Sequence, residues 1–290
     1  MRDDALGVII PSLGRPATLH ETLLSVLRQS RQPGQIIVSV PDDSHLAPES
    51  RQLAITFVRS ETGLCRQRNR AIEALQPGIE RVTFLDDDVE LHAEYFEQMA
   101  RLFAAHSEVV LADGKVLLDA RDMSRAEAEA IIAAAGTPQS AAVKTIGPQL
   151  AYGCNLTVRR DALATLRFDE RLPLYGYMED RDFAFGCARL GAVMRCESAM
   201  LVHLRPTAGR ISARRFGFSQ VMNPLYLWSK GNYVTRRHVA WQVCRPFLIN
   251  GARAVASNEK ALRWRQFAGN CYALTLALRG RIAPEEMLRL

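Results

Sequence analysis

Short apolar runs alternate with helix-like segments in the first part of the chain, and this alternation limits the fold more than any other feature. Four runs rich in β-branched residues have the length of buried strands, at 6–10, 35–40, 55–60 and 81–85. Helices are expected between them at 18–30 and 63–75. Alternating strands and helices predict an α/β fold, with a parallel sheet, helices on both faces, and ligands at the carboxyl ends of the strands.

The next residues extend the same pattern. We expect helices at 92–105 and 124–136, the second of them inserted over the sheet, and strands at 108–118 and 193–204. Beyond this point the sequence becomes basic and helical. Two domains are therefore expected, at residues 1–204 and 205–290.

Three consecutive carboxylates, Asp86, Asp87 and Asp88, follow the apolar run VTFL. Repulsion among them makes partial burial costly unless a positive charge compensates. A surface turn or a helix N-cap would account for one acid, and it stays an alternative for the cluster. A divalent cation bound together with substrate phosphates explains three acids better, because such a cation prefers carboxylate oxygens.

A second group of acids, Glu179, Asp180 and Asp182, lies in the stretch YMEDRDF ahead of a helix-like segment. Acids are favoured at a helix N-terminus, which is the explanation expected for Asp182. For Glu179 and Asp180 that explanation competes with a general base placed beside a hydroxyl acceptor. His203 ends the last predicted strand, and a lone histidine there gains a role only if the sheet brings it to Asp88.

Together these stretches resemble the inverting family-2 nucleotide-diphospho-sugar glycosyltransferases of the GT-A fold. The resemblance covers residues 6–204 and rests on an ordered series of motifs: VIIPSLGRPATL, IIVSVPDDS, GLCRQRNRAI, FLDDDVEL, GCNLTVRR, FDERLPLYGYMEDRDF and VHL. It implies a Rossmann-like mixed, mostly parallel sheet flanked by helices. The sequence departs from the family where VPDDSHL replaces the usual VDDGS, and where GCARLG lacks an arginine that is common one turn earlier.

The resemblance also implies roles for particular residues. Asp86 and Asp88 would form a D-x-D pair for Mn²⁺ or Mg²⁺, with Asp88 the direct ligand and His203 a further metal or diphosphate ligand. Asp180 would be the catalytic base, and Glu179 its neighbour contacting the acceptor. The implied nucleotide-sugar contacts are Pro11, Ser12 and Arg15 in the first loop, Asp42 or Asp43 at the base, Arg68 and Asn69 in support, Asp86 or Asp87 near the ribose, and Gly153 and Asn155 beside the donor sugar.

The net charge of +6 is unevenly distributed between two regions of the chain. Residues 205–290 contain 15 Lys or Arg against 3 Asp or Glu, whereas residues 1–204 contain 22 against 28. This difference predicts different partners for the two regions. In the basic region, apolar residues from Trp264 to Leu278 recur at helical spacing between arginines, and Pro246 is expected to break the stretch WQVCRPFLI.

Two kinds of partner explain the basic region, and both stay open. Its helices would pack on the catalytic domain or on a second subunit in a homodimer. Alternatively, they would rest on an anionic membrane surface, where each nearby Lys or Arg adds ~1 kcal/mol. Nucleic acid is not expected, because no recognition motif accompanies the basic residues.

The sequence thus predicts a metal-dependent inverting hexosyltransferase. It would move a sugar from a nucleoside diphosphate, expected to be UDP, to a hydroxyl of a saccharide or lipid-linked saccharide in polysaccharide or glycoconjugate synthesis. The alternatives are a nucleotidyltransferase and an inactive nucleotide-sugar-binding module of the same fold. The acidic start MRDDALGVII is unlike a signal peptide, CYALTLAL is too short to span a bilayer, and six cysteines show no CxxC spacing. A cytoplasmic chain is expected, with a peripheral position on the inner face of the plasma membrane as an alternative.

Overall fold

A computed structural model of the chain describes residues 1–138, 142–207, 211–232 and 235–290. The chain divides into two compact units. Unit 1 comprises Met1–Thr62, Arg66–Phe168 and Phe183–Gly209, and unit 2 comprises Gly63–Cys65, Asp169–Asp182 and Arg210–Leu290. The second unit therefore contains a segment from the middle of the chain together with the C-terminal helices.

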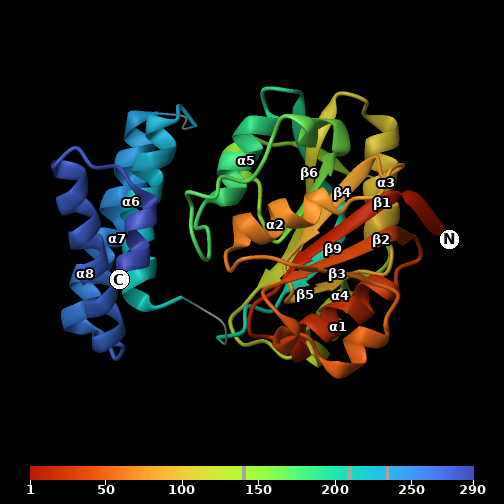
Figure 1. Cartoon of the computed structure of the whole chain (residues 1–290), viewed down its shortest axis with the longest axis horizontal. Helices are drawn as coiled ribbons and strands as arrows, with labels where there is room; N and C mark the ends of the chain where they lie inside the picture. Colours follow the sequence, from red (N-terminus) through yellow and green to blue (C-terminus); the bar gives the residue numbers. More distant parts are fainter. Residues whose placement is uncertain (139–141, 208–210, 233–234) are drawn as a thin grey trace. The chain divides into compact units, whose positions relative to one another are not determined.

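Unit 1 is built on one mixed sheet (Figure 1). Within the described residues its strands are β1 (Arg2–Pro11), β2 (Gln32–Val40), β3 (Thr56–Arg59), β4 (Arg81–Leu85), β5 (Val89–Leu91), β6 (Val109–Asp119), β7 (Val143–Thr145), β8 (Asn155–Arg159) and β9 (Ala192–His203). They lie in the order β3-β2-β1-β4-β8-β6-β9-β5, and β7 pairs with β9 off this path. The first four strands of this order are parallel, as are β6 and β9, whereas β8 runs antiparallel to both β4 and β6.

Helices cover both faces of this sheet, as the sequence predicts for an α/β fold. They are α1 (Pro16–Leu27), α2 (Leu64–Glu73), α3 (Tyr95–Ala105), α4 (Arg125–Ala135) and α5 (Glu179–Cys187). Helices α1 and α3 share a core with Val8 and Ile10 of β1 on one face. On the other face the ring of Phe84 meets those of Phe168 and Phe183, with centroid distances of 5.0 and 6.1 Å. The predicted fold class is confirmed.

The predicted elements differ from the observed ones mainly at their ends. The strand predicted at 81–85 is β4, and the helix predicted at 124–136 is α4, which packs on β9 and β5. A capping box starts α4, in which Ser124 Oγ accepts a hydrogen bond from the Glu127 amide. The strands β5 and β7 were not predicted, because three residues are too few to show an alternating pattern.

The strand register brings polar chain segments to one edge of the sheet. In the parallel pair β6–β9, Asp119 lies opposite His203. In the antiparallel pair β5–β9, Val89 lies opposite the same His203. The acidic turn that follows β4 directly precedes Val89, so the register fixes this turn beside the ends of β6 and β9.

Unit 2 contains three long helices, α6 (Ala213–Ser229), α7 (Arg236–Ala256) and α8 (Lys260–Leu278), and a short 3₁₀ helix at Pro284–Arg289. Helices α6 and α8 cross at two glycines. A Cβ atom on Gly217 would collide with the backbone of Gln266, and one on Gly269 with the backbone of Arg214. The Asn270 Nδ2 amide donates a hydrogen bond of 2.6 Å to the Gly217 carbonyl, so the two helix backbones are in close contact.

The prediction that Pro246 breaks its helix is wrong. Helix α7 is continuous through Pro246, although proline removes one backbone donor from the helix. Packing of α7 against α6 and α8 explains how the helix persists. None of the helices in the described parts of the chain is both long enough and apolar enough to cross a membrane.

Candidate active site

The ends of β4 and β9 bring Asp86, Asp88 and His203 together. Each residue offers one ligand atom, and these atoms lie within 4.8 Å of one another. His203 Nε2 is 3.1 Å from Asp88 Oδ1 and 3.8 Å from Asp86 Oδ2. The sheet thus brings His203 to Asp88, which was the condition for giving this histidine a role.

Buried charge dominates the electrostatics of this cluster. Burial would lower the pKa of His203, but hydrogen bonds to Asp119 and Asp88 and the charges of Asp88 and Asp86 raise it to about 10. Burial raises the pKa of Asp86, against the opposing charge of Arg68. For Asp88, burial acts in the same direction, yet the hydrogen bond and charge of His203, with the charge of Arg15, lower the pKa.

Asp87 does not belong to the group of ligand atoms that its two neighbours form with His203. It is fully buried, and its carboxylate accepts a hydrogen bond of 2.5 Å from Ser12 Oγ and pairs with Arg15 at 2.5 Å. Arg15 also reaches Asp88 Oδ2, at 2.8 Å. Burial raises the pKa of Asp87 to about 7, although the charge of Arg15 opposes this. Asp87 therefore ties the loop after β1 to the acidic turn.

Arg68 holds the turn from its other side. This fully buried side chain donates hydrogen bonds to Asp86 Oδ1 at 3.1 Å and to the Gly153 carbonyl at 2.8 Å. Its guanidinium also lies over the ring of Phe168, 4.9 Å from the centroid. Arg68 thereby connects α2 to two segments that the sequence predicts to border the donor.

Two other predicted contacts point inward. Asn69 exchanges two hydrogen bonds with the backbone of Phe168, at 2.9 and 3.0 Å. Asn155 is fully buried, and its side-chain oxygen accepts hydrogen bonds from the Gly114 amide and, at 3.2 Å, from Tyr95 Oη. Both side chains hold chain segments in place beside the acidic turn.

The first two loops of unit 1 are tied to each other. Pro11 ends β1 opposite Ser39 of β2, and the Gly14 amide donates a hydrogen bond of 2.9 Å to His45 Nδ1. Asp42 accepts hydrogen bonds from the amide and hydroxyl of Ser44. Asp43 instead forms an ion pair of 3.0 Å with Arg59. Both aspartates are exposed at the carboxyl end of β2, where a nucleotide base is expected.

Two residues that the sequence analysis did not identify, Asp119 and Tyr152, contact His203 at Nδ1, the ring nitrogen that faces away from Asp88. Its Nδ1 is 3.3 Å from Asp119 Oδ1 and 3.1 Å from Tyr152 Oη. Tyr152 Oη also donates a hydrogen bond of 2.9 Å to Asp119 Oδ2. The ring is therefore held at Nδ1 while Nε2 faces Asp88. This arrangement is typical of metal-binding histidines, which a carboxylate orients through the second ring nitrogen.

A sequence model of glycosyl transferase family 2 matches residues 7–167, which is more than half of the chain. The chain belongs to glycosyl transferase family 2. No curated protein matches the sequence of this family-2 glycosyltransferase.

Solved structures match this glycosyltransferase along almost its whole length. The crystal structure of S. aureus TarS 1–349 has a TM-score of 0.56 and 15% identity, covering 98% of this chain and 91% of that one. The same fragment with UDP-GlcNAc gives 0.56 and 14%, covering 95% and 92%. The longer S. aureus TarS structure gives 0.55 and 14%, covering 97% of this chain and 55% of that one. At such identities the likeness shows the fold, which is GT-A.

The acidic cluster of this family-2 glycosyltransferase fits a divalent cation. Two carboxylates and an imidazole nitrogen form a suitable donor set. The raised pKa of Asp86 and that of Asp87, at about 7, show that burial disfavours the negative charge now gathered there. A cation between Asp86, Asp88 and His203 would relieve that cost.

The second predicted pair, Glu179 and Asp180, begins α5 and belongs to unit 2. The Glu179 amide donates a hydrogen bond of 2.7 Å to the Gly176 carbonyl, and Asp180 Oδ1 accepts one of 2.8 Å from the Arg181 amide. Asp182 follows in the first helical turn, as predicted. It forms an ion pair of 2.6 Å with Lys230, so its carboxylate is engaged in holding α5 to the end of α6.

Proposed function

We propose that this glycosyltransferase is metal-dependent and inverting, and that it moves a sugar from a UDP-linked donor to a hydroxyl of a saccharide or lipid-linked saccharide. The grouping of Asp86, Asp88 and His203 at the carboxyl ends of β4 and β9 carries the proposal. Ligands bind at this edge of an open α/β sheet. The TarS fragment that shares the fold is described as a complex with UDP-GlcNAc, which makes this donor the first to test.

The charges at the cluster suit a diphosphate. Three carboxylates, at Asp86, Asp87 and Asp88, face two arginines and a histidine whose raised pKa keeps it protonated at neutral pH. Mn²⁺ or Mg²⁺ bound in place of the His203 proton would make the cluster more positive, which favours a diphosphate. The bound cation would supply Lewis-acid stabilisation of the charge that develops on the leaving diphosphate.

The acceptor hydroxyl must lose its proton as its oxygen attacks the anomeric carbon. Asp180 is proposed to accept that proton while the bond between the sugar and the diphosphate breaks on the opposite face. One displacement of this kind inverts the anomeric configuration and needs no covalent intermediate. Glu179, its neighbour, is proposed to contact the acceptor. General bases of this kind contribute about 10²–10⁴-fold to the rate.

The backbone ahead of these acids supports a functional role. Leu174 and Met178 have φ values of 55° and 72°, in the left-handed region that non-glycine residues avoid. Such residues cost about 1–3 kcal/mol each and persist where surrounding contacts hold them. Here the Leu174 carbonyl accepts a hydrogen bond of 2.8 Å from the Leu64 amide, and the Tyr177 carbonyl one of 2.7 Å from Asn223. Strain of this kind concentrates at functional sites.

Turnover of UDP-GlcNAc by the whole chain with Mn²⁺ tests the proposal, with UDP release as the readout. Asp180→Asn should lower kcat by about 10²–10⁴-fold while Mn²⁺-dependent UDP binding is retained. Asp88→Asn should weaken that binding itself. The transferred sugar should have the opposite anomeric configuration to the donor, which NMR of the product establishes. Undiminished turnover in Asp180→Asn would remove Asp180 as the base, and a retained configuration would contradict inversion.

A further inference from the structure

One face of α7 carries large apolar side chains that no other described residue covers. Trp241, Leu248 and Val255 recur every seven residues and are 62%, 67% and 72% exposed. Seven residues are close to two helical turns, so the three side chains lie along one line about 21 Å long. Cys244 is exposed between the first two. A row of this kind marks a surface that binds something other than water.

The opposite face of α7 fixes the orientation of this row. Phe247 packs on Phe267 of α8 with ring centroids 5.0 Å apart. Asn250 is buried, and its Nδ2 donates hydrogen bonds of 2.9 Å to Gln220 and to Asn270. These contacts anchor α7 within unit 2. The outward position of the apolar row is therefore set by the packing of the helix.

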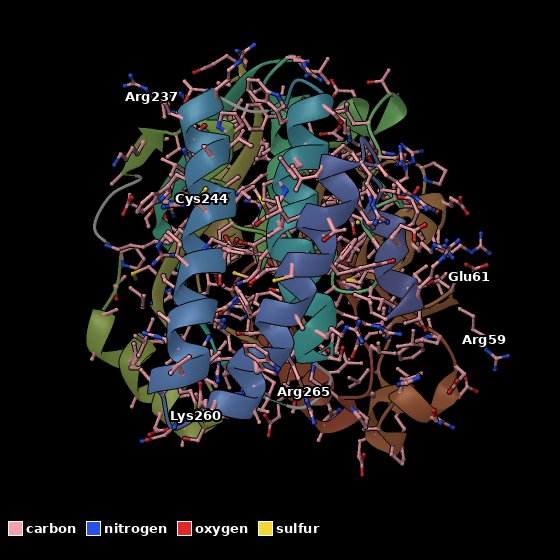
Figure 2. The ribbon with its side chains drawn as sticks, turned by 90° about the vertical axis from the view of Figure 1, so that its left-hand side faces the viewer. Arg59, Glu61, Arg237, Cys244, Lys260 and Arg265 are labelled. Atoms are coloured by element: carbon pink, nitrogen blue, oxygen red, sulfur yellow. The ribbon has the colours of Figure 1, made fainter. Side chains whose placement is uncertain are left out.

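Arginines accompany the apolar row. Arg237, Arg245 and Arg253 are exposed, and α7 contains no acidic residue. Successive residues of an α-helix are turned by about 100°, so Arg237 and Arg245 lie about 40° to either side of Trp241, whereas Arg253 lies away from the row. Throughout the described ranges, no carboxylate forms an ion pair with any of the three. Figure 2 faces the three helices of unit 2, with Arg237 near one end of α7, Cys244 along it and Lys260 near its other end.

We propose that this face of α7 docks on an anionic lipid surface, with the apolar row in the headgroup layer and the arginines on lipid phosphates. Helices with such a face lie in the plane of the bilayer surface. A second copy of the chain fits less well, because a two-fold contact would place the arginines of one α7 against those of the other. A soluble polyanion would pair with the arginines and leave Trp241, Leu248 and Val255 in water.

Binding to vesicles in the absence of any nucleotide tests this proposal separately from sugar transfer. The whole chain is sedimented with vesicles of phosphatidylcholine, either pure or with 30% phosphatidylglycerol. Binding is expected to the anionic vesicles, to weaken with salt, and to shift the fluorescence of Trp241 to the blue, a change that Trp241→Phe reduces.

Two sets of variants separate charge from apolar contact. Replacing Arg237 and Arg245 by glutamine should lower the partition coefficient on the order of 25-fold, from about fivefold for each charge. A matched control removes two exposed arginines of unit 1 that form ion pairs, Arg70→Gln and Arg101→Gln, and should change binding little. The double variant Leu248→Gln, Val255→Gln should also weaken binding, with its melting temperature confirming that unit 2 is folded.

Three results would overturn the proposal. The first is no binding of the unaltered chain to anionic vesicles at millimolar lipid. The second is binding that neither the arginine set nor the double variant weakens. The third is a homodimer at micromolar concentration, seen by light scattering, that the double variant dissociates.

Discussion

At the scale of single residues, the support of His203 is the feature that the sequence could not predict. From the sequence, His203 is predicted at a strand end, with a role only if the sheet brings it close to Asp88. Asp119 lies 84 positions earlier, and only the parallel register of β6 and β9, which contains bulges, sets it opposite His203. No local pattern marks such a pairing. Likewise, Asp86, Asp87 and Asp88 look alike in sequence, and only the structure shows that Asp86 and Asp88 meet His203 while Asp87 meets Ser12.

The contacts of Asp119 predict that it positions His203 for the proposed metal. Asp119→Asn keeps the shape of the side chain but removes the charge that orients His203 through Nδ1. We expect Mn²⁺ affinity to fall about 10–100-fold, because carboxylates behind metal-binding histidines have effects of this size. Titration calorimetry of Mn²⁺ binding without donor measures this directly. Glu108→Gln, at an exposed residue of unit 1, is the control, and equal affinity in both variants would contradict the role of Asp119.

At the scale of helices and strands, the sequence predicts the long elements. It does not predict the three-residue strands or the contacts between helices. Apolar runs and helical spacing located β4, α3 and α4, whereas β5 and β7 exist only through their pairing with β9. The prediction for Pro246 is wrong because it considered only the backbone donor that proline removes. In the structure, packing against neighbouring helices keeps α7 continuous through Pro246. The crossing of α6 and α8 at Gly217 and Gly269 also has no local signature.

That crossing predicts a strong effect of adding one methyl group. In Gly269→Ala the new Cβ would meet the Arg214 carbonyl, which is backbone and cannot rotate away. We expect the free energy of unfolding of unit 2 to fall by about 1–3 kcal/mol. Trp228, Trp241 and Trp264 all lie in unit 2, so denaturant titration followed by tryptophan fluorescence reports on it.

Gly251→Ala in α7 is the matched control for this substitution. Its nearest neighbour is the Phe267 ring at 3.1 Å, which can shift slightly, and alanine favours the helix by about 1 kcal/mol. Its denaturation midpoint should therefore stay near that of the unaltered chain. If Gly269→Ala were as stable as Gly251→Ala, the two helix backbones would not be in close contact.

The ion pairs of Lys230 predict that the stability of unit 2 depends on pH. Its Nζ lies 2.7 Å from Asp169 and 2.6 Å from Asp182. Burial would raise the pKa of Asp169, but hydrogen bonds from Lys230 and Tyr226 lower it below its ordinary 3.8. Burial would lower the pKa of Lys230, but hydrogen bonds to the two aspartates raise it above 10.5. Both pKa shifts therefore stabilise unit 2 at pH values between the ordinary pKa of Asp169 and that of Lys230.

Lys230→Met should therefore lower the free energy of unfolding by about 1.5–3 kcal/mol at pH 7, the range for hydrogen bonds to charged groups. The stability contributed by Asp169 is present above pH 3.8 and is lost as the pH falls through its lowered pKa. The difference between the unaltered chain and the variant should thus shrink toward pH 3. Denaturant midpoints from tryptophan fluorescence at pH 7, 5 and 3 measure it, and a difference independent of pH would contradict the pairing.

At the scale of the whole molecule, unit 1 contains the mixed sheet with the Asp86–Asp88 turn, and unit 2 contains the basic C-terminal helices. The division of charge was visible in the sequence, and so was the order of motifs that resembles family 2. Composition could not assign residues 169–182 to the compact unit of the C-terminal helices, because that assignment depends on long-range pairs such as Asp169 with Lys230. The predicted base, Asp180, lies in this segment.

Asp86, Asp88 and His203 are proposed to form a metal-dependent nucleotide site. Thermal unfolding of the whole chain tests this site. It is followed by circular dichroism with UDP, GDP, CDP or dTDP, each with and without Mn²⁺. UDP should raise the melting temperature only when Mn²⁺ is present, with about 2.7 kcal/mol of stabilisation at 100 times the dissociation constant, and Asp88→Asn should abolish the effect. A site of another kind is indicated if no diphosphate stabilises the chain at millimolar concentration, or if UDP does so equally without Mn²⁺.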